Sequence, residues 1–228
     1  PEATSKALWD YVEKYDQDEF KDIKPVAFHV HAAGVFHMVD KPIKQMADLK
    51  GLKVRAPTRL TNKYLAALGA TPVAMPVPQV GEALVKSVID GALVPFEVVP
   101  AVKIQELVKY HSATDAKAPA IYTSAFVFAM NKAKYESLPA DLKKVIDDNS
   151  GKATSGFAGK AFYDADLEGK KTTEKNTHNV IGVKDLKAFQ TAGQTVADDW
   201  VKEMSEKGVN GKQLIDAAKS LIAKNAGK

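Results

Sequence analysis

Between residues 52 and 94 the chain alternates short apolar runs with amphipathic stripes, and this alternation restricts its fold more than any other feature. Residues 52–55, 71–75 and 92–94 are typical of short strands bounded by Pro or Gly. Two stripes with apolar residues at three- and four-residue spacing lie between them and predict helices. Strand–helix–strand units of this length join parallel strands. We therefore predict an α/β fold with a parallel sheet here.

The rest of the chain continues the mixture of helices and strands. The pattern predicts a helix at the start, strand-like segments before and after the alternating region, and helices towards the end. The expected helices cover residues 3–15, 142–146, 152–176, 186–204 and 214–222, and the expected strands cover 26–30, 35–38 and 120–129. The segment 152–176 is expected to form one long, partly exposed helix.

Composition excludes several classes of protein. The 228 residues include no Cys, so disulfides and thiolate metal sites are excluded, although the compartment stays open. The net charge of +4 arises from 32 basic and 28 acidic residues that are interleaved, which argues against nucleic acid as a partner. No run reaches the ~20 apolar residues of a membrane span. Since neither an initiator Met nor a signal peptide is present, we expect a processed, trimmed or truncated chain.

No catalytic motif is present. The chain lacks HExxH, GxSxG, GxxxxGK and GxGxxG, and Asp147-Asp148 is expected on the solvated face of a helix. His29 and His31 are two residues apart on a predicted strand and so share a face, but a hydrogen-bonded His or a polar cleft lining is favoured over a metal site. We expect no catalytic residue, no cofactor and no metal.

Arg55 is the residue with the clearest chemical implication. It ends a short strand in an apolar setting, just before Ala-Pro and a helix. Side chains at the carboxyl ends of parallel strands face the crevice where α/β proteins bind ligands, and the planar guanidinium matches a carboxylate. The alternatives are an internal salt bridge or a surface position.

Four motifs, taken in order, resemble one protein family. They are Asp48-Leu49-Lys50-Gly51-Leu52-Lys53-Val54-Arg55-Ala56-Pro57, Leu68-Gly69-Ala70-Thr71-Pro72, Val88-Ile89-Asp90-Gly91 and Phe128-Ala129-Met130-Asn131. With these motifs the chain is similar to the solute-binding proteins of tripartite ATP-independent periplasmic (TRAP) transporters, in the dicarboxylate-receptor-like family.

The resemblance implies a two-lobed periplasmic-binding-protein-like fold, with a cleft between the lobes and a long lobe-spanning helix. Lobe 1 would comprise residues 1–32 and 121–155, and lobe 2 residues 33–120 and 156–228. Family members usually carry further strands before the point where this chain begins. Lobe 1 is therefore expected to be incomplete, with an exposed sheet edge.

The resemblance also implies ligand-binding residues. Arg55 matches the main anchor for the ligand carboxylate. Phe96 would pack on the ligand, or alternatively in the core, and Glu97 would bind a hydroxyl, a cation or a neighbouring base, or form a hinge salt bridge. His31 and Gly34 match the first segment that crosses between the lobes, and Tyr122 the second. Alternatively, His31 caps backbone groups and Tyr122 provides interlobe packing.

The function implied is that of a monomeric periplasmic receptor without enzymatic activity. It would bind a small organic acid and deliver it to TRAP membrane permease subunits for secondary transport. The apolar Leu93 stands where many members have a polar residue, which favours an aromatic or branched acid over a sugar acid, although a 2-oxo acid stays open. The alternative is an α/β enzyme or a ligand-sensing regulatory domain that acts on a small acid, which chemical conversion of the acid or a DNA-binding segment would reveal.

Overall fold

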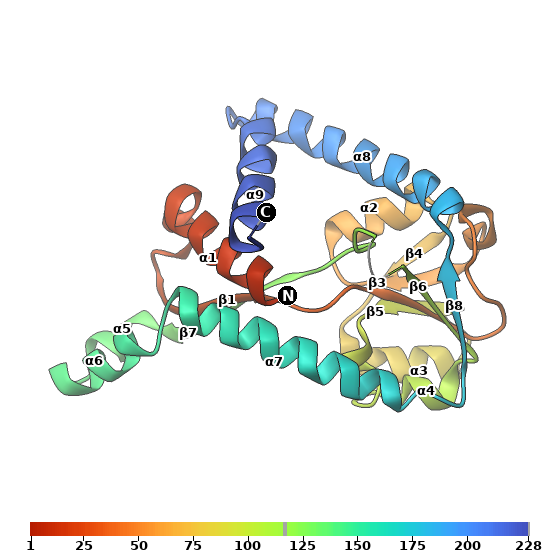
Figure 1. Cartoon of the computed structure of the whole chain (residues 1–228), viewed down its shortest axis with the longest axis horizontal. Coiled ribbons are helices and arrows are strands. Elements are labelled where there is room, and N and C mark those ends of the chain that lie inside the picture. Colours follow the sequence, from red (N-terminus) through yellow and green to blue (C-terminus); the bar gives the residue numbers. More distant parts are fainter. Residues whose placement is uncertain (116–117, 228) are drawn as a thin grey trace. The chain divides into compact units, whose positions relative to one another are not determined.

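The computed structural model describes residues 1–115 and 118–227, and the chain forms two compact units (Figure 1). Unit 1 comprises Pro1–His31, Ser124–Asp164 and the chain from Lys207 onward, and unit 2 comprises Ala32–Thr123 and Ala165–Glu206. The predicted lobes differ from these units in the C-terminal part, which the sequence placed entirely in lobe 2. The difference arises because the last helix packs on the first helix of unit 1.

Unit 1 consists of helices around a two-stranded sheet. Its elements are α1 (Glu2–Tyr15), β1 (Ile23–Val30), β7 (Ala125–Asn131), α5 (Lys132–Glu136), α6 (Ala140–Asp148), the first part of α7 (Lys152–Lys171) and α9 (Gly211–Asn225). β1 and β7 pair antiparallel, so segments about a hundred positions apart form one sheet.

The second half of β1 is buried and held by two serine side chains. Ser5 Oγ of α1 accepts the Val30 N–H at 3.0 Å, and Ser155 Oγ of α7 accepts the Phe28 N–H at 3.0 Å. The Phe28 ring also packs against Trp9, with centroids 5.6 Å apart. These contacts satisfy buried donors on one strand and fix both helices against it.

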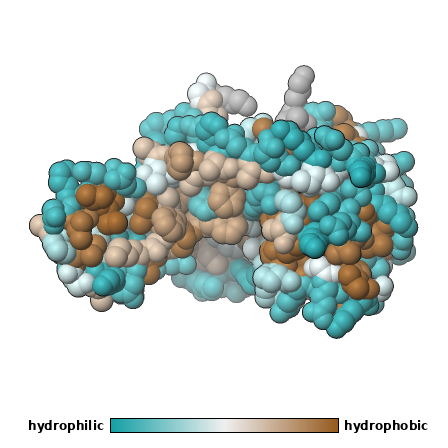
Figure 2. Space-filling model, turned by 90° about the horizontal axis from the view of Figure 1, so that it is seen from below, coloured by the Kyte–Doolittle hydropathy of each residue, from teal (hydrophilic) through white to brown (hydrophobic). Residues whose placement is uncertain are grey.

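Unit 1 also exposes hydrophobic side chains. In Figure 2 they gather over the part of unit 1 that carries α5 and α6. The exposed ones on β7 and α6 include Phe126, Val127, Phe128, Leu142 and Val145. Phe128 is 63% exposed, so the described residues leave the two-stranded sheet open around this side chain.

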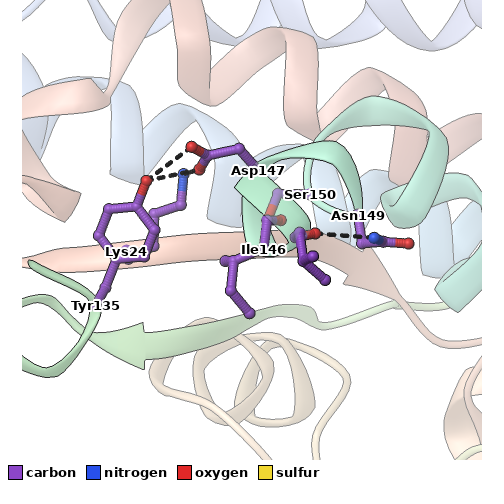
Figure 3. A network of polar contacts seen from close by, with 7 residues as sticks. Lys24, Tyr135, Ile146, Asp147, Asn149 and Ser150 are labelled. Carbon is purple, nitrogen blue, oxygen red and sulfur yellow. Dashed lines mark hydrogen bonds and ion pairs between the residues drawn. The ribbon is translucent and has the colours of Figure 1, made fainter. Parts of the chain in front are cut away.

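Asp147 connects three elements of unit 1 (Figure 3). Its carboxylate accepts hydrogen bonds from Lys24 Nζ of β1 at 2.6 Å and from the Tyr135 hydroxyl of α5 at 2.8 Å. Its neighbour Asp148 instead pairs with Lys144 one turn earlier. Asp147, predicted on a solvated face, therefore also links α6 to α5 and β1. The link is of the modest strength that exposed ion pairs have.

Unit 2 contains a six-stranded sheet. Its elements are β2 (Val35–Met38), β3 (Lys53–Ala56), α2 (Arg59–Ala67), β4 (Thr71–Ala74), α3 (Val80–Val85), β5 (Gly91–Val94), α4 (Ile104–Leu107), β6 (Tyr110–Thr114), the last turns of α7, β8 (Thr177–Ile181) and α8 (Val183–Glu206). The strand order is β4-β3-β5-β2-β6-β8.

The pairing confirms the parallel sheet expected between residues 52 and 94. β3 pairs parallel with β4 and β5, whereas β2 lies antiparallel between β5 and β6. β6 and β8 pair parallel, and neither strand was predicted. The long strand expected at 120–129 begins only at Ala125, and the long helix expected at 152–176 ends at Lys171.

Both faces of the unit 2 sheet are covered, and the two faces have separate cores. Phe36, Met38 and Leu93 lie on the face covered by α2 and α8. Val35, Ala92 and Val94 lie on the other face, with apolar residues of α3 and α4. Adjacent strand residues alternate between the two cores, as the pleat requires. Among the described residues, no helix is both long and apolar enough to cross a bilayer.

Candidate functional site

Arg55 places a charged side chain inside unit 2. Its neighbours on β3, Val54 and Ala56, are buried in the core beneath α2 and α8, so Arg55 projects from the opposite face. The residue is only 4% exposed. Thr58 caps the helix that follows, because its hydroxyl accepts the Thr61 N–H. The strand end and the capped helix fix the position of Arg55.

The Arg55 guanidinium is bound by backbone carbonyls. Nε donates to the Met75 carbonyl at 3.1 Å and Nη1 to the Leu93 carbonyl at 3.4 Å. Within residues 1–115 and 118–227, no carboxylate forms an ion pair with it. Burial lowers the pKa of Arg55 from its ordinary value. A buried cation without a counter-charge is costly, and an anion of suitable size would compensate it.

Tyr122 lies beside Arg55 and depends on Gly34. The Tyr122 hydroxyl donates to the Leu93 carbonyl at 3.2 Å, the same oxygen that accepts from Arg55. The Gly34 N–H donates to the Tyr122 carbonyl at 3.0 Å. A Cβ on Gly34 would lie 1.8 Å from Tyr122 Cε1, so only glycine leaves room for the ring. Gly34 and Tyr122 are thus joined in unit 2.

Phe96 belongs to the core of unit 2. The residue is 4% exposed, and its ring packs against the imidazoles of His37, His111 and His178, with centroids 5.3–5.9 Å apart. Of the two roles considered for Phe96, core packing is the one that these contacts describe.

Glu97 is a partly buried acid with an unusual environment. Its Oε2 is buried and has no hydrogen-bond partner among the described residues. Burial, with a smaller effect of the nearby Asp166 carboxylate, raises the pKa of Glu97 to about 7. Asp166 of α7 accepts the backbone N–H groups of Phe96 at 2.7 Å and Glu97 at 3.3 Å. No described base pairs with Glu97, so the predicted hinge salt bridge is absent from the described structure.

His31 belongs to unit 1 and follows β1 directly. Its Nε2 accepts the Ser124 N–H at 3.1 Å, which is the backbone-capping role considered as an alternative. His29, two residues earlier, stacks against Phe126 and packs at a tilt against Phe162. Among the described residues, no group of three or more potential ligands is arranged to hold a metal ion.

A pocket of about 350 Å³ opens in unit 2 between α2, α8 and the segment before Ser124. Its lining includes Tyr64, Tyr122 and Phe189 but no charged side chain. Tyr64 donates its hydroxyl to the Phe189 carbonyl at 3.2 Å. The pocket therefore offers a carboxylate no charged partner, and Arg55 is not among its lining residues.

Two features of this region were missed at the sequence level. The carbonyls of Met75 and Leu93 bind Arg55, and backbone acceptors leave no mark in side-chain patterns. The burial of His37 was also not predicted. Its place in the otherwise apolar run Val-Phe-His-Met was the signal for a buried polar side chain, because a strand that is apolar on both faces is buried on both.

The family model "Bacterial extracellular solute-binding protein, family 7" (DctP) matches residues 6–204. The chain belongs to this family. The resemblance to TRAP solute-binding proteins is therefore confirmed, and it covers most of the described chain. This is a family of solute receptors and not one named for an enzymatic reaction.

Curated relatives agree with the DctP assignment. The "outer membrane transporter protein TsaT" of Comamonas testosteroni is 29% identical over 97% of this chain. The "2,3-diketo-L-gulonate-binding periplasmic protein YiaO" of Escherichia coli K12 is 29% identical over 72% of this chain. The matches span 66% and 49% of these two relatives.

Solved structures of DctP-type proteins confirm the predicted α/β fold class. A TRAP solute-binding protein from Rhodoferax ferrireducens T118 in complex with copurified benzoate is 47% identical, with a TM-score of 0.97 over 99% of this chain and 71% of that one. A marine metagenome TRAP protein specific for aromatic acid ligands, with 3-hydroxybenzoate, is 42% identical, with a TM-score of 0.95 over 98% of this chain and 70% of that one.

Proposed function

We propose that this chain is part of an extracytoplasmic receptor in which Arg55 binds the carboxylate of a small organic acid. The observation that carries the proposal is the buried Arg55 guanidinium, held by two carbonyls and paired with no carboxylate in the described part of the chain. Charge-assisted, bidentate hydrogen bonds to a carboxylate would compensate this charge. They contribute about 1.5–3 kcal/mol each.

We propose an aromatic monocarboxylic acid as the ligand. The two relatives with 47% and 42% identity hold benzoate and 3-hydroxybenzoate. In this chain, Arg55 projects from the sheet face whose core includes Ala92, Val94 and Phe96. A 2-oxo acid is the other ligand class predicted from the sequence, and the binding experiments below compare the two classes.

The wider role of the receptor is also a proposal. Membership of an extracellular solute-binding family supports a periplasmic location and delivery of the acid to a TRAP membrane permease. We propose that the receptor works as a monomer and releases its ligand unchanged. Recovery of intact benzoate after incubation with the protein would separate a receptor from an enzyme, and light scattering would report its oligomeric state.

The decisive experiment measures benzoate binding by titration calorimetry in matched arginine variants. Arg55→Ala and Arg55→Lys are expected to weaken binding by about tenfold or more, since lysine retains the charge but not the planar fork. Arg59→Ala is the control, because Arg59 is exposed and pairs with Glu203 at 2.8 Å. Unchanged affinity in both Arg55 variants would contradict the proposal.

A thermal-shift measurement on the wild-type protein defines the ligand class. Benzoate and 3-hydroxybenzoate are expected to raise the melting temperature, while pyruvate and glucuronate are not. A ligand at a hundred times its dissociation constant stabilises the folded state by about 2.7 kcal/mol. Stabilisation by pyruvate alone would replace the aromatic acid with a 2-oxo acid.

A further inference from the structure

A row of polar side chains crosses the sheet of unit 2. Arg55 on β3 lies opposite Ala92 on β5, and Ala92 lies opposite His37 on β2. His37 in turn lies opposite His111 on β6, and His111 opposite His178 on β8. Residues directly opposite on neighbouring strands share a face of the sheet. The arginine and three histidines, from segments far apart in the chain, therefore project from the same face.

The middle of this row is fully buried and joined by hydrogen bonds. His37 is 0% exposed and His111 1%. Their Nδ1 atoms are 2.6 Å apart, and His37 Nε2 is 3.1 Å from the Val94 carbonyl oxygen. The Phe96 ring covers both imidazoles. Val94 is the last residue of β5.

The partners determine which nitrogens carry hydrogen. A carbonyl oxygen only accepts, so His37 Nε2 must donate to Val94. A neutral imidazole has one N–H, so His37 Nδ1 accepts and His111 Nδ1 donates. A second proton on His37 would place two donors face to face. In agreement, burial lowers the pKa of His37 to about 3 and that of His111 to about 4.

The chain of contacts continues to the proposed ligand anchor. The carbonyl before Val94 is that of Leu93, which accepts from both Arg55 and Tyr122. Successive carbonyls of a strand point to opposite neighbours, so β5 is held by His37 on the β2 side and by Arg55 on the β3 side. A shift of the Val94 carbonyl would move the Leu93 carbonyl with it.

We propose that His37, held in its Nε2–H tautomer by His111, is a positioning residue for Arg55. It fixes the end of β5 through the Val94 carbonyl, so that the Leu93 carbonyl orients the guanidinium for the ligand carboxylate. The inference rests on the proposed function of Arg55. It gives His37, which is fully buried, a role in ligand affinity in addition to its role in core packing.

The test compares two replacements of His37 that differ in one donor. Gln places an amide N–H where it can reach the Val94 carbonyl, whereas Leu fills similar space without a donor. Benzoate affinity at pH 7 is expected to fall about tenfold or more in His37→Leu and to stay within about threefold of wild type in His37→Gln. His178→Gln is the control, because His178 belongs to the same row but bonds to Thr173. A core-packing role alone predicts equal affinity in the two His37 variants.

A second readout needs no variant and no ligand. Nitrogen-15 NMR of the imidazoles in the wild-type protein is expected to show His37 as the Nε2–H tautomer and His111 as the Nδ1–H tautomer. An Nδ1–H tautomer of His37 would overturn the inference. If His37→Leu does not fold, His111→Leu serves instead, since it releases the His37 tautomer. It must then lower benzoate affinity by about threefold or more.

The outcomes separate this inference from the proposed function. If wild-type protein binds no acid, or binds it equally well without Arg55, the proposed function fails. If binding depends on Arg55 but His37→Leu binds benzoate as wild type does, the positioning role alone fails.

Discussion

At the scale of single residues, Arg55 and Glu97 are both buried or partly buried ionisable side chains of unit 2, but their favoured charge states differ. Arg55 stays charged because a guanidinium does not lose its proton in proteins, and two carbonyls accept its hydrogen bonds. Glu97 has a buried oxygen without a partner and an acidic neighbour, Asp166, so the protonated form is favoured. The pKa of Glu97 is about 7, against an ordinary 4.5. Its contribution to stability is present below pH 4.5 and is lost as the pH rises through 7.

We therefore expect Glu97→Gln to increase the free energy of unfolding at pH 8 and to change it little at pH 5. Glutamine has the same size and carries no charge to desolvate. Urea unfolding at the two pH values measures the difference. Glu106→Gln, at an exposed position on α4, is the control. An equal effect of Glu97→Gln at both pH values would show that Glu97 is not a buried, titrating acid.

At the scale of elements, α7 contains three glycines, and the surroundings of Gly156 and Gly169 differ. A Cβ on Gly169 would lie 2.1 Å from the Phe96 carbonyl oxygen and 2.6 Å from its carbon. The three atoms nearest to a Cβ on Gly156 would all belong to the flexible Lys6 side chain, with Cε the closest at 2.3 Å. Backbone cannot yield as a lysine side chain can. Gly169 therefore lets α7 approach the segment that carries Phe96 and Glu97.

The same substitution in one helix should consequently have opposite effects. Gly156→Ala is expected to raise the free energy of unfolding by up to about 1 kcal/mol, because alanine favours helix over glycine by that amount. Gly169→Ala is expected to lower it by about 1–3 kcal/mol, since overpacking outweighs the helix propensity. Denaturant unfolding of both variants measures this, and stabilisation by Gly169→Ala would mean that α7 is not in close contact with Phe96.

At the scale of the whole molecule, buried histidines set the response to acid. His37 and His111 have pKa values of about 3 and 4 in the folded chain, against an ordinary 6.5. As the pH falls below 6.5, these two histidines bind protons in the unfolded state but stay neutral in the native state, which lowers stability. Glu97 acts oppositely, because the native state binds its proton first. The net expectation is a stability that decreases with falling pH.

The histidine effect is isolated in Glu97→Gln. Between pH 6.5 and pH 5 the free energy of unfolding of this variant should fall more steeply than that of wild type. Each histidine that is protonated in the unfolded state and neutral in the native state contributes a slope of about 1.4 kcal/mol per pH unit. With Trp9→Phe added, the fluorescence of Trp200 on α8 reports on unit 2 alone. A flat or rising profile in this background would contradict the neutral burial of His37 and His111.

The sequence by itself determined the local elements and the place of Arg55. Strand–helix alternation is encoded in side-chain spacing, so β3, α2, β4 and β5 were predictable, and Arg55 at the end of β3 followed. Its motifs also identified the family. β6 and β8 were missed because short polar strands such as Thr177–Ile181 have no clear period.

Only the tertiary structure decided which distant segments meet. Packing of α9 on α1 places the C-terminus in unit 1, and the register of β2, β6 and β8 aligns His37, His111 and His178. Tertiary packing also places the Phe96 ring in the core and brings His31 Nε2 within hydrogen-bond distance of the Ser124 N–H. Strand register and helix docking depend on the burial that residues far apart in the chain achieve together, so no local pattern records them.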